Sequence, residues 1–262
     1  MLMTERRAVV TGGCKGIGAA IATRLEADGL SVVRADLPAA AGAWRAGGGT
    51  AVDVDVSDTR SVDAMIAAAV GLLGGLDVMV NNAGVAEQRA RVDAMPDSDW
   101  DRVISVNLGG AFRCTRAAFD HLRASGHGAV VSLSSTWGLG GVPGYAAYCA
   151  SKAGIIGLTR AMAADGGPFN IRVNAVSPGY VANDMGGSLD GLDAEAAARA
   201  WAGRDLQASF QPLGRQCDVA EIAAAVSFLV SDQASFVTGT VLPVDGGQSN
   251  RLNTGEQQWP AP

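Results

Sequence analysis

Short runs of β-branched and other apolar residues alternate along the chain with longer segments whose apolar residues recur at helical spacing. The short runs are almost continuously apolar, which is typical of strands buried on both faces. Strand–helix alternation of this kind predicts right-handed crossovers and an α/β doubly wound parallel sheet of about seven strands with helices on both faces. Strands are expected at Ala8–Thr11, Ser31–Ala35, Thr50–Val54, Asp77–Val80, Ala129–Leu133, Arg172–Val176 and Val241–Val244. Helices are expected near Gly16–Ala27, Thr59–Leu73, Trp100–Ala124, Ala147–Ala164 and Asp218–Val230.

One segment, 183–212, interrupts this alternation. It contains Gly186-Gly187 and a helical stretch rich in Ala, Glu and Arg at Asp193–Ala202. Two interpretations are equally open: a substrate-loop insertion beside a binding site, or a surface helical hairpin. Because the chain shows neither an internal repeat nor a linker, a single domain over residues 1–262 is expected. The polar tail at 248–262 is either flexible or reaches another subunit.

Composition narrows the function classes. Of the 262 residues, 48% are hydrophobic and 18% are charged, as in compact globular proteins. The net charge of −6 and the lack of a basic block argue against a nucleic-acid partner. No apolar stretch reaches membrane-spanning length and no secretory leader is recognisable, so a cytoplasmic protein without a membrane partner is expected. The four scattered cysteines, at positions 14, 114, 149 and 217, predict neither a metal site nor a disulfide framework.

A glycine-rich turn directly follows the first expected strand, in Thr11-Gly12-Gly13-Cys14-Lys15-Gly16-Ile17-Gly18. Glycines permit a tight turn and a close approach of the backbone to a pyrophosphate at the start of the next helix. The spacing is G-x-x-x-G-x-G, and a glycine turn without any ligand is the alternative. The position of the turn, after the first strand and at the start of a helix, favours a nucleotide site.

The second expected strand leads to Asp36, which stands 18 residues after Gly18. A carboxylate at this location accepts hydrogen bonds from ribose hydroxyls and repels a 2′-phosphate, so it favours NAD over NADP. Arg34 and Lys15 are possible partners of a 2′-phosphate and argue for NADP. We favour NAD because Asp36 is better placed for the ribose.

Lysine occurs only twice in the chain, and one copy, Lys152, stands four residues after Tyr148. On a helix these two side chains share one face, so the ammonium and the phenol can meet in one pocket. A cation beside a phenol lowers the pKa of the phenol, which could then exchange a proton with a bound alcohol or ketone. A half-buried tyrosine beside a lysine that extends to solvent is the simpler interpretation of the pair alone.

Further motifs occur in a fixed order along the chain. After the turn Thr11–Gly18 they are Asp55-Val56-Ser57-Asp58, Asn81-Asn82-Ala83-Gly84, Asn107, Ser134-Ser135, Tyr148 with Lys152, Pro178-Gly179 and Val241–Gly247. Ser135 stands 13 residues before Tyr148. In these motifs and intervals the chain resembles the short-chain dehydrogenase/reductase family over nearly its whole length. The resemblance implies a Rossmann-like fold.

The resemblance also implies a catalytic tetrad of Asn107, Ser135, Tyr148 and Lys152. Tyr148 would be the acid/base, and Lys152 would lower its pKa and bind the nicotinamide ribose. Ser135 would donate a hydrogen bond to the substrate oxygen, and Asn107 would hold a water that links Lys152 to solvent.

A dinucleotide cofactor follows from the same resemblance, with NAD favoured by Asp36, and the family is usually homotetrameric. Asn183 departs from the family pattern, because a threonine usually stands five residues after the proline of the Pro-Gly turn. An asparagine amide can both donate and accept, so cofactor binding can survive this change, but the geometry of loop closure is left open. The expected cofactor-binding residues are Gly12, Cys14, Lys15, Gly16, Ile17, Gly18, Asp36, Asp55, Val56, Asn81, Asn82, Tyr148, Lys152, Pro178, Gly179, Val181 and Asn183.

The predicted function is NAD(H)-dependent interconversion of a small, largely apolar secondary alcohol and its ketone. The substrate pocket is expected to involve Val85, Trp137, Val142, Tyr145, Tyr180 and Trp201, although either tryptophan could equally be a core or interface residue. Two alternatives stay open: a 3-oxoacyl thioester reductase of the same family, and a non-catalytic dinucleotide-binding sensor or scaffold. The acidic net charge and the length of 183–212 count against the thioester substrate. His121 and His127 are expected at the surface, outside the catalytic site.

Overall fold

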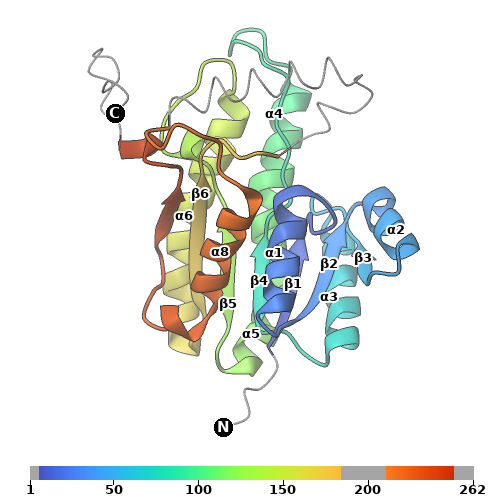
Figure 1. Ribbon diagram of the computed structural model, residues 1–262. Coiled ribbons are helices and arrows are strands. Elements are labelled where there is room, and N and C mark those ends of the chain that lie inside the picture. The colour runs from blue at the N-terminus through green and yellow to red at the C-terminus, as the bar shows by residue number, and fades with distance from the viewer. Residues whose placement is uncertain (1–5, 184–210, 251–262) are drawn as a thin grey trace.

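The computed structural model describes residues 6–183 and 211–250 (Figure 1). Trp201, nearly all of the segment 183–212 and most of the tail 248–262 therefore lie outside the described residues. The single-domain organisation and the substrate-loop interpretation of 183–212 stay predictions.

Seven parallel strands form one sheet in the order β3-β2-β1-β4-β5-β6-β7, which confirms the predicted fold class. The order of the strands reverses between β1 and β4: β2 and β3 lie on one side of β1, and β4 to β7 follow on its other side. In open sheets of this kind, ligands bind outside the carboxyl ends of the strands at that reversal. The strands are β1 (Arg7–Thr11), β2 (Ser31–Asp36), β3 (Ala51–Asp53), β4 (Val78–Asn81), β5 (Ala129–Leu133), β6 (Arg172–Pro178) and β7 (Val241–Val244).

Helices cover both faces of the sheet (Figure 1). They are α1 (Gly16–Ala27), α2 (Pro38–Ala46), α3 (Thr59–Leu73), α4 (Asp97–Ile104), α5 (Gly110–Ser125), α6 (Ala146–Gly166) and α8 (Val219–Val230). Short helical turns are η1 (Ser105–Gly109), η2 (Thr136–Gly138), η3 (Gly167–Phe169), η4 (Asp232–Ala234) and η5 (Gln248–Asn250).

Successive strand residues enter two separate cores, because side chains alternate across a strand. Val9 of β1 packs with α3, α5 and α6 on one face. Ala8 and Val10 pack with α1 and α8 on the other. Both faces of the central strands are thus covered, which explains why their sequences are continuously apolar.

The structure differs from the predicted helices in two places. The single helix expected at Trp100–Ala124 is instead α4, a wider π-type turn at η1, and α5. Helix α2 was not predicted, because its small residues after Pro38 carry little apolar periodicity. By contrast, α1 and α3 begin and end where the pattern predicts.

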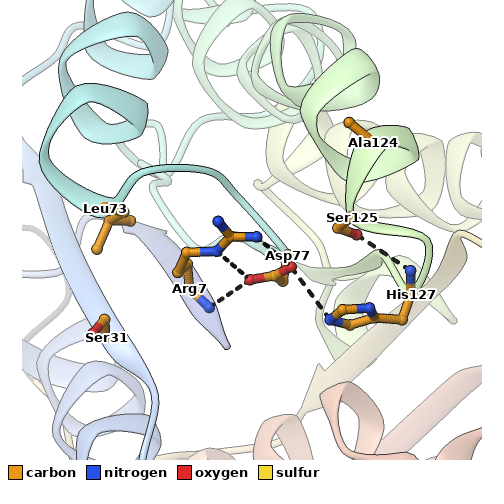
Figure 2. Close-up of a pocket in the computed structure, with 7 residues that line it drawn as sticks. All are labelled: Arg7, Ser31, Leu73, Asp77, Ala124, Ser125 and His127. Carbon is orange, nitrogen blue, oxygen red and sulfur yellow. Dashed lines mark hydrogen bonds and ion pairs between the residues drawn. The ribbon is translucent and has the colours of Figure 1, made fainter. Parts of the chain in front are cut away.

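A partly buried ion pair lies at the amino ends of the central strands β1 and β4, beside the hollow that Figure 2 shows. The Asp77 carboxylate, 1% exposed, accepts bonds from the Arg7 backbone N–H at 2.8 Å and from its Nε at 2.7 Å. The His127 Nε2 atom lies 3.3 Å from the same carboxylate, so this histidine belongs to a structural cluster. Because Arg7 begins β1 and Asp77 directly precedes β4, the cluster lies at the opposite end of these strands from their carboxyl ends.

No helix in residues 6–183 and 211–250 is long and apolar enough to cross a membrane.

Candidate active site

The glycine turn links the carboxyl end of β1 to α1. Gly12 and Gly16 adopt left-handed φ values of 62° and 54°, which disfavour any other residue. A Cβ on Gly18 would overlap the Gly12 carbonyl oxygen, so the turn and the helix can pack closely only with glycine there. Lys15 provides no side-chain cap to α1, and the first backbone N–H groups of a helix are the groups that commonly bind a phosphate.

Asn82 supports this turn from the neighbouring strand. Its Nδ2 donates to the carbonyls of Thr11 at 2.9 Å and Gly12 at 3.1 Å. Asn81, in contrast, directs its amide into the protein, where Nδ2 donates to the hydroxyls of Thr115 and Ser132. Asn82 thus holds the glycine turn of the predicted cofactor site, whereas Asn81 bonds within the protein interior.

Asp36 ends β2 beside the turn, and its carboxylate is held by backbone groups. Oδ2 accepts from the Cys14 N–H at 3.0 Å, and Oδ1 accepts from the Leu37 N–H at 2.9 Å. The remaining lone pairs of both oxygens can accept from ribose hydroxyls. Burial raises the pKa of the Cys14 thiol to about 11, with the charge of Asp36 acting in the same direction, so the thiol stays neutral.

Arg34, the residue that argued for NADP, is engaged inside the protein and is 2% exposed. Its Nη1 donates to the Gly13 carbonyl at 3.1 Å, and its Nη2 contacts a carboxylate oxygen of Glu26 at 2.8 Å. The guanidinium also stacks on Trp44, 4.1 Å from the ring centroid. The exposed Lys15 is the other candidate cation.

At the adenine side of the predicted site, Asp55 and Val56 lie between β3 and α3. Asp55 is exposed, and its Oδ1 accepts from both the backbone N–H and the hydroxyl of Ser57. Val56 is buried and contacts Gly110, where a Cβ would lie 2.8 Å from its side chain.

Ser135, Tyr148 and Lys152 meet at the carboxyl end of β5. Ser135 directly precedes η2, and its side chain lies near that of Tyr148, where it acts to lower the pKa of the phenol. Lys152, one turn after Tyr148 on α6, donates through Nζ to the Leu133 carbonyl at 2.7 Å and lies 5.5 Å from the Tyr148 ring centroid. A Cβ on Gly138 would lie 2.6 Å from the Lys152 backbone, so this glycine lets η2 pack closely on α6.

Asn107 lies in the π-type turn η1, and such turns are frequent at functional sites. Its Oδ1 accepts from the Val85 N–H at 2.8 Å, and its Nδ2 donates to the Val85 carbonyl at 2.9 Å and to the Ser151 hydroxyl at 3.0 Å. A Cβ on Gly84 would lie 3.3 Å from the Asn107 Oδ1 and 3.5 Å from the Lys152 Nζ. Asn107 and Lys152, two members of the predicted tetrad, therefore both lie beside Gly84.

Burial raises the pKa of Tyr148 to about 12; Cys149 and Glu87 act in the same direction, and Ser135 opposes them. Burial lowers the pKa of Lys152 to about 8. The direction for Tyr148 is opposite to the one that the Tyr-Lys spacing predicts. The ammonium is engaged by the Leu133 carbonyl, and the loss of solvation of the phenol outweighs its influence.

Aromatic side chains line the neighbourhood of Tyr148. The Trp137 ring lies 4.8 Å from that of Tyr145 and 5.7 Å, edge to face, from that of Tyr148. Tyr180 lies near Trp137, whose side chain acts to lower the pKa of the Tyr180 phenol. Val85 packs against the same cluster. Val142 is half-buried in the loop before α6, and Trp201 lies outside the described residues.

The chain after β6 returns to the glycine turn. Gly179 follows Pro178, and its N–H donates to the Val244 carbonyl. Val181 pairs with Cys217 in an isolated parallel bridge. The Asn183 amide lies against Gly16, where a Cβ would overlap its Oδ1. Asn183 is thus positioned across the predicted phosphate site.

Two buried residues beside this site were not predicted. Gln211, 1% exposed, accepts from the Tyr180 N–H at 2.9 Å and donates to the Arg215 carbonyl. Glu87, 5% exposed, accepts from the Tyr148 N–H. Neither belongs to a periodic pattern, and their only signal in the sequence is closeness to motif residues.

Within the described part of the chain no group of three or more His, Cys, Asp or Glu residues could hold a metal ion. His121 is half-buried on α5, away from the tetrad in sequence and without a role in its hydrogen bonds.

Comparisons with known proteins identify the family of the chain. A family described as Enoyl-(Acyl carrier protein) reductase matches residues 12–249. The chain belongs to the short-chain dehydrogenase/reductase family, whose members are dinucleotide-dependent oxidoreductases.

Several relatives are similar over nearly their whole length. Cis-4-hydroxycyclohexanecarboxylate dehydrogenase of Sinomonas cyclohexanicum is 42% identical, over 93% of this chain and 96% of the relative. Cyclopentanol dehydrogenase of Comamonas sp. (strain NCIMB 9872) is 39% identical, over 94% of this chain and 97% of the relative. The crystal structure of levodione reductase superposes with a TM-score of 0.84 at 34% identity, covering 95% of this chain and 99% of that one.

Proposed function

We propose that this oxidoreductase uses NAD(H) to interconvert a small, largely apolar secondary alcohol and its ketone. The observation that carries the proposal is the proximity of Ser135, Tyr148 and Lys152 to one another and to the aromatic side chains of Trp137, Tyr145 and Tyr180.

In the direction of ketone reduction, Tyr148 donates its phenolic proton to the carbonyl oxygen as the carbonyl carbon gains a hydride. The raised pKa of Tyr148 keeps the phenol protonated at neutral pH, the state required for this step. Ser135 donates a hydrogen bond to the same oxygen and stabilises the charge that develops on it. The chemistry that a bound nicotinamide supplies is the hydride itself.

Lys152 and Asn107 support proton return to Tyr148. The Lys152 ammonium and the Asn107 amide both border Gly84, and the Asn107 amide continues to Ser151. In alcohol oxidation the same groups act in reverse: Tyr148 accepts the hydroxyl proton and Lys152 stabilises the resulting phenolate.

The choice of NAD is supported by two charges. Asp36 offers carboxylate oxygens at the carboxyl end of β2, where a 2′-phosphate would be repelled. The contacts of Arg34 with Gly13, Glu26 and Trp44 leave that cation buried rather than directed at the ribose.

The substrate class is supported by the cluster and by the relatives. Trp137 presents a flat, largely apolar surface next to the Tyr148 ring and packs on Tyr145, which suits a compact ring-shaped substrate. The printed names of two relatives refer to cyclohexane and cyclopentane alcohols.

A panel of cyclic and acyclic secondary alcohols and ketones, followed by NADH absorbance, tests the proposal. We expect turnover of cyclic members with NAD(H), and a lower kcat/KM with NADP(H). Faster turnover of acetoacetyl thioesters would instead establish the thioester reductase. NADH binding without turnover of any member would establish the sensor.

A further inference from the structure

Glu87 is a buried carboxylate that the mechanism above does not use. It follows β4 in the loop Gly84-Val85-Ala86-Glu87, and its side chain points at the start of the helix that carries Tyr148. Both carboxylate oxygens lie 3.1 Å from the Tyr148 backbone nitrogen. A carboxylate that is only 5% exposed needs such partners, because burying a charge without a partner is strongly destabilising.

The contact replaces a missing helix cap. Helix α6 begins at Ala146, and the preceding Tyr145 makes no side-chain cap bond. Tyr148 is the third helical residue, whose N–H is one of the groups that a capping side chain normally satisfies. Glu87 satisfies it from another part of the chain, and its negative charge lies at the positive end of the helix dipole.

Further hydrogen bonds connect the same loop to neighbouring elements. Asn107 holds the Val85 backbone through both its N–H and its carbonyl. The Ala90 N–H donates to the Gly144 carbonyl at 3.1 Å, just before α6. The loop therefore links η1 to the beginning of α6, and Glu87 is its link to Tyr148.

The charged and titratable groups around Tyr148 come from several elements. Lys152 and Cys149 lie on α6, Tyr145 directly precedes it, and Glu87 faces it from the loop. From α4, Arg102 donates to the Ala86 carbonyl at 3.1 Å and pairs with Asp99. Arg89 lies over Gly144, where a Cβ would be 2.7 Å from its Cγ. Among these groups, Glu87 alone combines a negative charge with a direct bond to the Tyr148 backbone.

We propose that Glu87 is a positioning residue, which fixes Tyr148 at the start of α6 and, through its charge, moves to higher pH the range in which Tyr148 exchanges a proton. This inference rests on the proposed function of Tyr148 as acid/base. A carboxylate nearby disfavours the phenolate, so the charge of Glu87 contributes to raising the pKa of Tyr148. The charge thereby favours the protonated state that reduces a ketone.

Two substitutions separate charge from position. Glu87→Gln keeps an oxygen that accepts from the Tyr148 N–H but removes the charge. We expect kcat/KM for alcohol oxidation to rise about threefold to tenfold on the acidic side of the pH profile, because a larger fraction of Tyr148 is deprotonated there. Glu87→Asp keeps the charge on a shorter side chain, so its pH profile should stay at the wild-type position while kcat falls.

Asp218→Asn is the matched control. Asp218 caps α8 by accepting from the Ala220 N–H, so this variant removes a cap charge from a different helix. Its pH profile should coincide with that of the wild type. Melting temperatures of all three variants identify any general loss of folding.

A measurement that does not depend on enzyme turnover tests this inference separately from the proposed function. The chain has three tyrosines, so ultraviolet titration of the phenolates, with Tyr148→Phe subtracted, follows Tyr148 directly. Glu87→Gln should make Tyr148 titrate at lower pH than in the wild type. An unchanged titration and an unchanged pH profile, or an equal shift in Glu87→Asp, would overturn the inference. A shifted titration in a protein that turns over nothing would refute the proposed function alone.

Discussion

At the scale of single residues, the site is determined by which charges are free and which are engaged. Arg34 is an example of a residue whose contacts could not be predicted from the sequence. Because it stands two residues before Asp36, it was a possible partner of a 2′-phosphate. The structure has it stacked on Trp44 and paired with Glu26. That arrangement depends on a tertiary contact with α2, a helix that the sequence pattern did not predict.

The first prediction concerns Asp36. Asp36→Asn removes the charge that repels a 2′-phosphate and weakens the acceptor of the ribose hydroxyls. Because a hydrogen bond to a charged group contributes about 1.5–3 kcal/mol, we expect the Kd for NAD to rise about tenfold or more and the preference over NADP to shrink. Fluorescence titration with NADH and NADPH measures both. Asp63→Asn on the exposed surface of α3 is the control, and equal values for the two variants would refute the role of Asp36.

A second prediction concerns pH. Because burial raises the pKa of Tyr148 to about 12, the phenol is protonated throughout the neutral range. We expect kcat/KM for ketone reduction to vary little between about pH 6 and pH 8, whereas kcat/KM for alcohol oxidation rises with pH, as expected when the base must first lose its proton. Initial rates in both directions across this range provide the measurement. An oxidation rate that falls as pH rises would contradict the assignment.

At the scale of elements, local signals predicted boundaries well where they were complete. Helix α3 has an Asp58 cap and a left-handed Gly74 at its end, and its predicted range was confirmed. The predicted helix over Trp100–Ala124 was wrong because its apolar spacing contains no sign of the π-type turn. That turn is stabilised by distant contacts, such as those of Asn107 with Val85 and Ser151.

The glycine turn gives the third prediction. Gly18→Ala would force its Cβ into the Gly12 carbonyl, so we expect the turn to move, the Kd for NADH to rise at least tenfold and stability to fall by about 1–3 kcal/mol. Gly71→Ala in α3 is the control, because its Cβ would meet nothing within 4 Å. That control should be neutral or slightly stabilising, by up to about 1 kcal/mol. Wild-type cofactor binding in Gly18→Ala would refute the close-packing argument. Calorimetric binding and thermal unfolding measure both effects.

At the scale of the whole molecule, the two ends of the parallel sheet have different roles. The carboxyl ends gather the glycine turn, Asp36, Ser135 and the Pro178-Gly179 turn, an outcome that the strand order alone predicts. The amino ends carry the cluster of Arg7, Asp77 and His127 (Figure 2). The sequence could not reveal this cluster, because its members come from distant parts of the chain and share no motif.

This separation gives a fourth prediction. Burial raises the pKa of Asp77, but its bonds to Arg7 outweigh burial and leave the pKa lowered. A lowered folded-state pKa stabilises the protein above the unfolded-state value, about 3.9, and this contribution is lost as pH falls through the folded-state pKa. Asp77→Asn should therefore cost about 2–3 kcal/mol at neutral pH and less in acid, with kcat/KM unchanged.

Urea unfolding at neutral and acidic pH measures the loss. Asp120→Asn, which breaks an exposed pair with Arg123, is the control and should change stability by less than about 1 kcal/mol. An equal loss of stability for Asp77→Asn at both pH values would contradict the electrostatic account.

The most direct test of the account is the comparison of turnover with cofactor binding in Tyr148→Phe. If Tyr148 is the acid/base, removing its hydroxyl should lower kcat for a cyclic secondary alcohol by about 100-fold to 10,000-fold while the Kd for NADH changes far less. Retention of wild-type kcat in Tyr148→Phe would contradict the central claim.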